Sequence, residues 1–352
     1  MVDWLAGKRI KGTSTERTAS FIPSVGGWVE LGRTTLGSTA DTISVASLAD
    51  KRYYMILADQ RASGSTNQGF RLNGDVTSTY AQRGNFNGTE NILAPASSLM
   101  GNWGSAVTTN AFHVGYLANK SDKEKLAIIH NVTQGTAGAG YAPSRQEGVG
   151  KHAQTSVAIN AVSLTNTDAG DYISGSELVV LGWDPADTHA TNFWTELASV
   201  QGTASSQILS SGTITAKKYL WIQGFTGGAG GGAGHNSAIQ FNNDTATNYA
   251  TRRSLDGGAD DSSWINQAYA QVGTNSHCFF NYFIINNSAN EKLCIGHIAQ
   301  RSTVGAGYAP ARGEFVCKWN NISAQITEID LMQQTTSINW GTDVYMKVWG
   351  SN

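Results

Sequence analysis

Short apolar runs, many of them alternating with polar residues, dominate the chain. They are rich in β-branched and aromatic residues and are bounded by Gly, Asn, Asp and Ser, a pattern typical of antiparallel strands. No convincing long amphipathic helix interrupts them, so the pattern predicts an all-β fold. In the first half of the chain we predict strands over 28–31, 42–45, 52–57, 112–117, 126–129, 155–164 and 177–181.

The sequence contains a tandem repeat of this pattern. The segment 28–31 (Trp-Val-Glu-Leu) returns as 194–197 (Trp-Thr-Glu-Leu), and 138–143 (Gly-Ala-Gly-Tyr-Ala-Pro) returns unchanged as 305–310. The offsets are 166 (194 − 28) and 167 (305 − 138), so few residues are gained or lost between the copies. A period this long exceeds that of solenoid or propeller repeats, so each copy is predicted to be a whole domain.

We therefore predict two tandem, homologous antiparallel β-sandwich domains of the jelly-roll-like kind. The first covers residues 25–186 and the second 187–352, with about eight strands each. The segment 183–189 between them is short, so the two domains are expected to pack side by side as one rigid body. Residues 1–24 precede the duplication and form a short N-terminal arm, either ordered only where it meets another surface or simply disordered.

Composition narrows the function. The chain has 40 Gly and only 14% charged residues, whereas soluble domains usually carry about 25%. Low charge with many small polar residues suits strands, turns and surfaces covered by neighbouring subunits. The net charge of −2 argues against direct nucleic-acid binding, which normally requires a basic stripe.

Cysteine and hydropathy give further expectations. Cys278, Cys294 and Cys317 all lie in the second copy without a CxxC spacing, so buried free thiols are expected rather than a zinc site. The sequence contains no run of 18 apolar residues, so it predicts no membrane span. The first residues lack a signal-peptide pattern. Assembly in a reducing host cytoplasm is the corresponding expectation.

One candidate contact element recurs as an Asp…Tyr…Arg set. Asn-Gly-Asp and Asn-Asn-Asp are turn sequences, since Asn and Gly accept left-handed φ and Asp bonds nearby amides. The Tyr and Arg that follow could stack and reach back to the Asp, and a glycan pocket would use the same residue types. The candidate interface or glycan contacts here are Asp75, Tyr80 and Arg83 in the first copy and Asp244, Tyr249 and Arg252 in the second.

The unchanged Gly-Ala-Gly-Tyr-Ala-Pro string is followed in each copy by Arg and Glu. Arg145 and Glu147, and likewise Arg312 and Glu314, would share one face of the next strand. A structural corner is the favoured interpretation, because the glycines permit a tight turn and Pro ends strand pairing. An inter-subunit contact through Arg145 and Arg312 is the alternative.

Signals for catalysis, cofactors or metals are weak. The histidines do not recur as a set, and His130 matches His297 only by position. No HExxH, GxSxG or EF-hand string is present. The Gly-rich segment 227–235 lacks the Lys-Ser/Thr of a phosphate loop and is predicted to be a hairpin tip, and 256–261 is predicted to be a solvated loop rather than a calcium site. We therefore predict no enzyme activity, no cofactor and no metal.

The chain resembles β-sandwich structural proteins of viruses, especially those of marine phages and related environmental viruses. The residues that carry the resemblance are the string 28–38 (Trp-Val-Glu-Leu-Gly-Arg-Thr-Thr-Leu-Gly-Ser), 50–55, the turn 71–75 and the closing strand 175–182. The resemblance implies a jelly-roll-like sandwich and symmetric self-assembly, with no catalytic residues. The second copy weakens the first string, since Ala-Ser-Val-Gln-Gly-Thr stands at 198–203.

The sequence thus favours a viral structural protein located in the virion, with a capsid or capsid-surface role preferred over a tail role. Its expected partners are further copies of itself, in a trimer or larger assembly, and other virion proteins. The alternative is a glycan- or receptor-binding module of a tail or surface, with host glycans as ligands and duplicated loops providing avidity.

Overall fold

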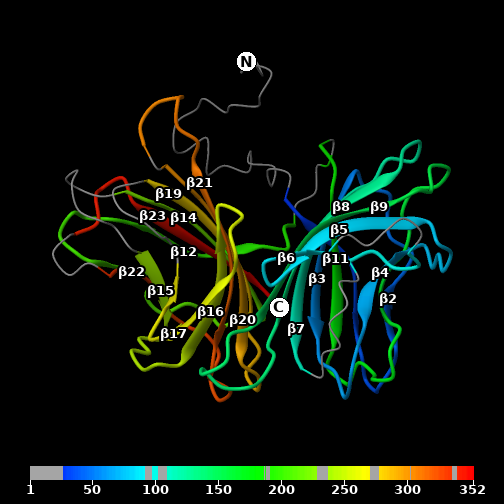
Figure 1. Cartoon of the computed structure of the whole chain (residues 1–352), viewed down its shortest axis with the longest axis horizontal. Coiled ribbons are helices and arrows are strands. Elements are labelled where there is room, and N and C mark those ends of the chain that lie inside the picture. Colours follow the sequence, from blue (N-terminus) through cyan, green and yellow to red (C-terminus); the bar gives the residue numbers. More distant parts are fainter. Residues whose placement is uncertain are drawn as a thin grey trace.

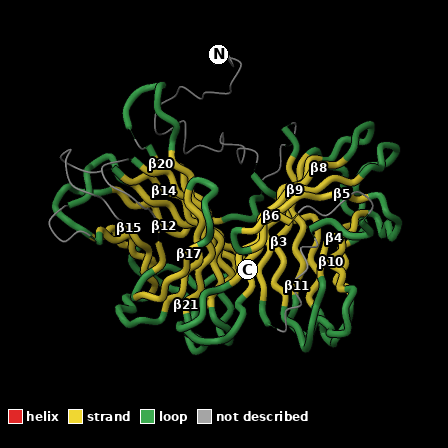
Figure 2. The backbone as a smooth tube through the Cα atoms, viewed as in Figure 1, coloured by secondary structure: helices red, strands yellow, loops and turns green. Residues whose placement is uncertain are grey.

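The computed structural model describes residues 27–91, 97–101, 109–185, 187, 191–227, 237–269, 277–301, 303–334 and 339–352. The predicted N-terminal arm, Trp103 and most of the Gly-rich segment 227–235 lie outside these residues. Every regular element in the described part is a β-strand, which confirms the all-β prediction. Figure 1 shows two similar halves side by side, and Figure 2 shows strands linked throughout by loops.

The first half contains one large and one small sheet. The large sheet has eight strands in the order β1-β11-β3-β7-β8-β9-β5-β6, and the small sheet has three in the order β2-β10-β4. The strands are β1 (Val29–Thr35), β2 (Thr42–Val45), β3 (Tyr53–Gln60), β4 (Gln68–Leu72), β5 (Tyr80–Phe86), β6 (Thr89–Asn91), β7 (Ala111–Ala118), β8 (Lys125–Thr133), β9 (Ser144–His152), β10 (Val162–Asn166) and β11 (Glu177–Trp183).

The second half repeats this topology. Its large sheet has the order β12-β23-β14-β19-β20-β21-β16-β17, which matches the first strand by strand, and its small sheet has the order β13-β22-β15-β18. The strands are β12 (Thr195–Gln201), β13 (Ile208–Ser210), β14 (Tyr219–Thr226), β15 (Ser237–Phe241), β16 (Tyr249–Leu255), β17 (Asp261–Ile265), β18 (Ala268–Tyr269), β19 (Cys278–Ile285), β20 (Lys292–Gln300), β21 (Ala311–Trp319), β22 (Ile329–Gln333) and β23 (Tyr345–Ser351).

Two details differ from the prediction. Each half has more strands than the expected eight, because short hairpin strands such as β6 and β17 extend the large sheets. The predicted strand 155–164 is regular only from Val162, where β10 pairs with β2 and β4. The preceding residues 155–161 form a connection whose amides bond to side chains, as when Asn119 accepts from the amide of Ile159 at 3.0 Å.

Each large sheet buries both of its faces, at least in part. One face packs against the small sheet of its own half, around Ile56 and Leu164 in the first half and Ile222 and Leu331 in the second. The other face packs against the large sheet of the opposite half, so the small sheets lie outermost (Figure 1). This shared core contains Met55, Leu57, Phe112, Val114, Val132, Val179 and Leu181 from the first half and Phe193, Trp194, Tyr219, Phe283, Ile285, Leu293, Ile295 and Val316 from the second.

A buried lysine holds the same loop in each copy. Lys125 and Lys292, from the repeated Glu-Lys-Leu string, are both 1% exposed. The Lys125 Nζ donates to the carbonyls of Lys120, Lys123 and Gln154, and the Lys292 Nζ donates to those of Asn290 and Asn321. Since a buried ammonium must be satisfied by acceptors, these bonds explain why an apolar run includes Lys twice. Burial lowers the pKa of Lys292 to about 8.

Candidate functional site at the junction of the two halves

The Asp…Tyr element is a structural turn in both copies. Asp75 accepts hydrogen bonds from the Thr77 amide at 2.8 Å and from the Thr79 hydroxyl at 2.7 Å, and it pairs with His152 at 2.9 Å. Tyr80 is buried and its hydroxyl accepts from the Leu72 amide at 2.9 Å. Tyr80 stacks on His152, with ring centroids 4.5 Å apart, rather than on the expected arginine.

The second copy builds the same turn with other partners. Asp244 accepts from the Trp319 indole at 2.7 Å and from Asn248 at 2.8 Å. The hydroxyl of the buried Tyr249 accepts from the Phe241 amide at 2.9 Å, as Tyr80 does in the first copy. Trp319 therefore takes the place of His152 at the equivalent strand position, which preserves the bond to the turn carboxylate without a second ionisable group.

The arginines of these motifs lie apart from the turns. Arg83 is largely exposed and pairs with Glu90 at 3.1 Å, and Arg312 is exposed and pairs with Glu314 at 2.6 Å. Arg145 and Arg252 lie instead between the two halves. The Arg252 Nε donates to the Pro143 carbonyl at 2.8 Å, and Arg145 pairs with Asp260 at 2.5 Å, with both side chains only 2% exposed.

The loop 256–261 is held by arginines. Asp256 accepts from the Arg312 amide at 2.7 Å, Asp261 pairs with Arg253 at 2.7 Å, and Asp260 faces Arg145 of the other half. These carboxylates are therefore engaged with protein donors. The three cysteines are buried thiols that form no disulfide, as the sequence predicts.

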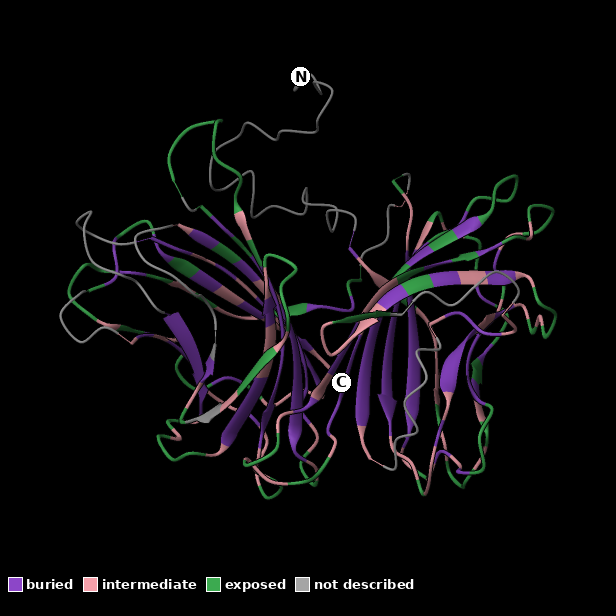
Figure 3. Ribbon diagram, viewed as in Figure 1, coloured by how far each residue is buried: buried purple, intermediate pink, exposed green. Residues whose placement is uncertain are grey.

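A large apolar surface remains open on the first half. An open groove of about 830 Å³ is lined by aromatic and aliphatic side chains of the large sheet, with Arg83 and Lys151 also among its lining residues. Its central residues Leu126, Ile128 and Val149 are 57%, 50% and 51% exposed. We call this surface the open face and define it by Trp28, Tyr53, Tyr116, Leu126, Ile128, Val149 and Trp183. Figure 3 shows the exposed positions along β8, β9 and β5.

The residues of the open face have equivalents in the second half that are buried. With an offset of 167 residues, Leu126, Ile128 and Val149 of the first half are equivalent in the repeat to Leu293, Ile295 and Val316 of the second half. These counterparts are 1%, 2% and 1% exposed, because they belong to the shared core and are covered by the first half. Trp28, Tyr53 and Tyr116 likewise correspond to Trp194, Tyr219 and Phe283 of the shared core. Among the described residues, the chain thus covers this surface in one copy and leaves it open in the other.

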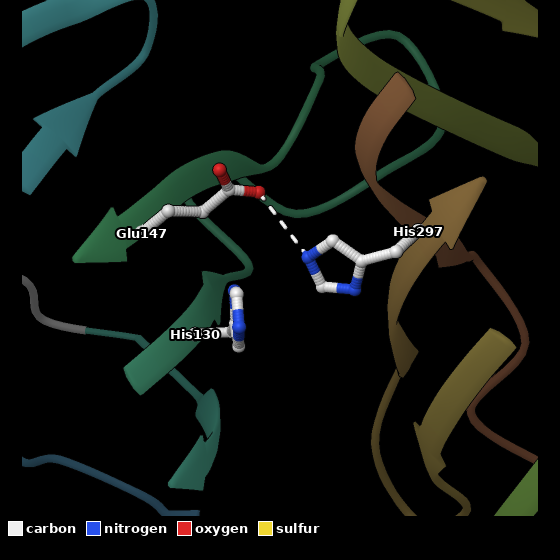
Figure 4. Close-up of side chains that lie close together, drawn as sticks. All are labelled: His130, Glu147 and His297. Carbon is white, nitrogen blue, oxygen red and sulfur yellow. Dashed lines mark ion pairs between the residues drawn. The ribbon is translucent and has the colours of Figure 1, made fainter. Parts of the chain in front are cut away.

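A cluster of two histidines and a glutamate lies where the large sheets meet. His130 on β8 and His297 on β20 occupy equivalent repeat positions, and their ring centroids are 4.3 Å apart. Glu147 on β9 reaches across, with its Oε1 3.5 Å from the His297 Nε2 (Figure 4). We call these three residues the His–Glu cluster. One nitrogen or carboxylate oxygen from each lies within 4.8 Å of the others.

Burial and charge set the protonation of the cluster. Burial lowers the pKa of His130 to about 3, with His297 adding to the effect. Burial alone would raise the pKa of Glu147, but His297 and the Arg145 guanidinium outweigh it and lower that pKa to about 2. Burial and the nearby Glu147 charge raise the pKa of Glu314, the repeat counterpart of Glu147. At neutral pH the cluster therefore combines a neutral His130 with an ionised Glu147.

We expect acid to lower the free energy of unfolding through protonation of His130. The unfolded histidine takes up a proton near its ordinary pKa of 6.5 and the folded one only near 3, so stability is lost as pH falls through this interval. The loss should be on the order of 1–2 kcal/mol between pH 6.5 and 5. Urea unfolding in EDTA should show a shallower pH dependence for His130→Gln than for the unmodified protein. An unchanged slope would contradict the assignment.

The common position of His130 and His297 in the repeat is the signal by which the sequence could have located this cluster. The sequence marks Glu147 only as the neighbour of Arg145. No spacing motif marks the set, because its members come from both copies and meet only when the large sheets pack.

Comparisons with known proteins give no family. No family model matches the chain, and no curated protein matches it. A search of solved structures finds a weak similarity to a human GIVD cytosolic phospholipase A2, with a TM-score of 0.14 and 6% sequence identity. The match covers 82% of this chain and 33% of that one, so the chain spans about a third of the phospholipase. A similarity at this level supports neither a shared fold nor a shared activity.

Within the described residues, no helix has the length and apolar character to cross a membrane.

Proposed function

We propose that this protein is a self-assembling structural subunit of a virion, and that a second copy of the same chain covers the open face. The observation that carries the proposal is the pair of equivalent surfaces, one buried in the shared core and one open. Apolar patches of this kind commonly mark protein–protein contacts. Fully burying a Leu, Ile or Val side chain stabilises by about 1.5–3 kcal/mol, and the three central residues are already about half buried, so covering each of them would contribute roughly half of that amount.

The chain also carries a surface of the right kind to cover the open face. Within one chain, the second half is covered by Leu57, Phe112 and Val132 of the first half. Their repeat counterparts are Gln223, Phe279 and Ala299, of which Phe279 is 45% exposed and Ala299 is also exposed. We call this the partner face. It is more polar than its counterpart, as suits a contact between chains that fold before they associate.

A contact between the open face of one copy and the partner face of another joins unlike surfaces. Such a contact repeats from copy to copy and gives closed rings or extended polymers according to its rotation. This is the behaviour required of a shell or tube component. The virion role rests on the sequence resemblance, and the assembly mode rests on the two faces.

Cross-linking an equimolar mixture of ¹⁴N- and ¹⁵N-labelled protein tests the arrangement. Lys151 lines the open face and Lys347 lies on β23 beside the partner face. We expect mixed-isotope cross-links between Lys151 of one copy and Lys347 of another, identified by mass spectrometry. Cross-links only within single chains would count against the proposal.

The aromatic lining of the open face favours a second candidate function, glycan binding. Tyr53 and Trp183 stack at a centroid distance of 5.4 Å, and Arg83 and Lys151 line the same groove from β5 and β9, further across the sheet. Aromatic faces with nearby polar side chains are suited to sugar rings. A glycan array with the unmodified protein and a Trp183→Ala variant would distinguish this function. Binding that the variant loses would favour it, and a blank array would remove it.

A further inference from the structure

The His–Glu cluster contains buried imidazole nitrogens that make no hydrogen bond. The Nδ1 of His130 is buried and has no hydrogen-bond partner, and the buried Nε2 of His297 makes no hydrogen bond but has the Glu147 Oε1 at 3.5 Å. A buried polar atom left unpaired is costly, and a native protein usually satisfies it with a donor, a water or an ion. Two such nitrogens beside one carboxylate call for a cation that accepts lone pairs from all three.

We propose that His130, Glu147 and His297 bind a divalent transition metal ion of the zinc type across the two halves. Two imidazoles and one carboxylate form a ligand set found in zinc sites, with the fourth position left to water. The ligands come from β8, β9 and β20, so the metal would join the large sheets at the point where they meet.

The distances fit after small side-chain movements. A tetrahedral zinc ion with bonds of about 2.0–2.2 Å separates its ligand atoms by roughly 3.3–3.5 Å. The His297 Nε2 and the Glu147 Oε1 are already 3.5 Å apart. One ligand atom from each of the three residues lies within 4.8 Å of the others, so side-chain rotations must shorten the longer of these separations.

The surrounding residues orient the carboxylate as a metal site needs. Glu147 uses its Oε2 to pair with the Arg145 Nη1 at 3.0 Å, which leaves Oε1 directed at His297. Arg145 is fixed in turn by Asp260, through bonds from Nη2 at 2.5 Å and from Nε at 3.3 Å. Outer groups that hold a ligand in place are typical of metal centres.

A purely structural histidine pair is the competing explanation. A T-shaped contact of the two rings at an interplanar angle of 66° would contribute packing alone. It would give no role to Glu147 beyond its 3.5 Å contact with the His297 Nε2, and it would leave the buried His130 Nδ1 unpaired. The two explanations differ in what happens when a metal is added.

Titration of EDTA-treated, dialysed full-length protein with Co²⁺ tests the proposal by visible absorption, with Zn²⁺ binding followed by calorimetry. We expect one metal ion per chain, visible d–d bands for Co²⁺, and a melting temperature that rises with added Zn²⁺. The variants Glu147→Gln and His297→Gln should weaken binding roughly tenfold or more, because each removes a ligand.

The matched control is His277→Gln. His277 is partly exposed, does not belong to the His–Glu cluster, and pairs with Asp343 at 3.7 Å. This variant should bind metal like the unmodified protein. Far-ultraviolet circular dichroism of each variant in EDTA shows whether it folds. Absence of Co²⁺ bands in the unmodified protein would overturn the proposal without reference to any variant, and so would full retention of binding by both folded ligand variants.

Discussion

Asp260→Asn is expected to lower the free energy of unfolding by about 3 kcal/mol, the lower end of the loss for a broken buried ion pair, because the buried Arg145 guanidinium then keeps only Glu147 as its counter-ion. Arg145 and Asp260 come from different halves and are each 2% exposed, so water cannot replace the lost partner. Urea denaturation followed by tryptophan fluorescence measures the effect.

The neighbouring residue provides the control. Asp261→Asn removes a carboxylate that pairs with Arg253, but this side chain is 58% exposed. Exposed ion pairs contribute about 0–1 kcal/mol, so this variant should unfold close to the unmodified protein. Equal losses for the two variants would show that the Arg145–Asp260 pair does not join the halves as described.

Ile128→Asp should weaken self-association roughly 30-fold or more, which corresponds to about 2 kcal/mol. Ile128 lies at the centre of the open face and is 50% exposed in the single chain, so the folded monomer tolerates a carboxylate there. In the assembly the same carboxylate would be buried against the partner face without a counter-charge. Sedimentation velocity over a concentration series measures the change.

Ile322→Asp is the matched control for this variant. Ile322 is 63% exposed, lies on a loop of the second half and belongs to neither face. Its substitution alters net charge and hydrophobicity by the same amount as Ile128→Asp. If both variants dissociate to the same extent, general charge repulsion rather than the open face governs assembly.

Much of the fold follows from local sequence, because strand pattern and repeat are local properties. The match of segment 28–31 to 194–197 correctly implied equivalent strands, and β1 and β12 indeed occupy the same edge of their sheets. The Asn-Gly-Asp turn also behaves as its residues require, since Asn73 and Gly74 adopt φ of 55° and 68°. The sequence pattern predicts too few strands, because three-residue strands such as β6 are too short to show an alternation.

The candidate site could not be predicted in the same way, because it depends on how the halves pack. Leu126 and Leu293 occupy identical strings in the sequence, yet one is 57% and the other 1% exposed. Nothing local distinguishes them, since only the unequal contact of the two large sheets does so. The His–Glu cluster is similar, because its histidines lie 167 residues apart (297 − 130) and meet only through that contact.

The most direct test of the central claim is the mass of the unmodified protein in solution, measured by light scattering across a range of concentrations. A chain of 37.4 kDa with an open face that binds a second copy should give masses that are multiples of this value and rise with concentration. A single species of 37.4 kDa at every concentration would contradict the claim, because the open face would then remain uncovered.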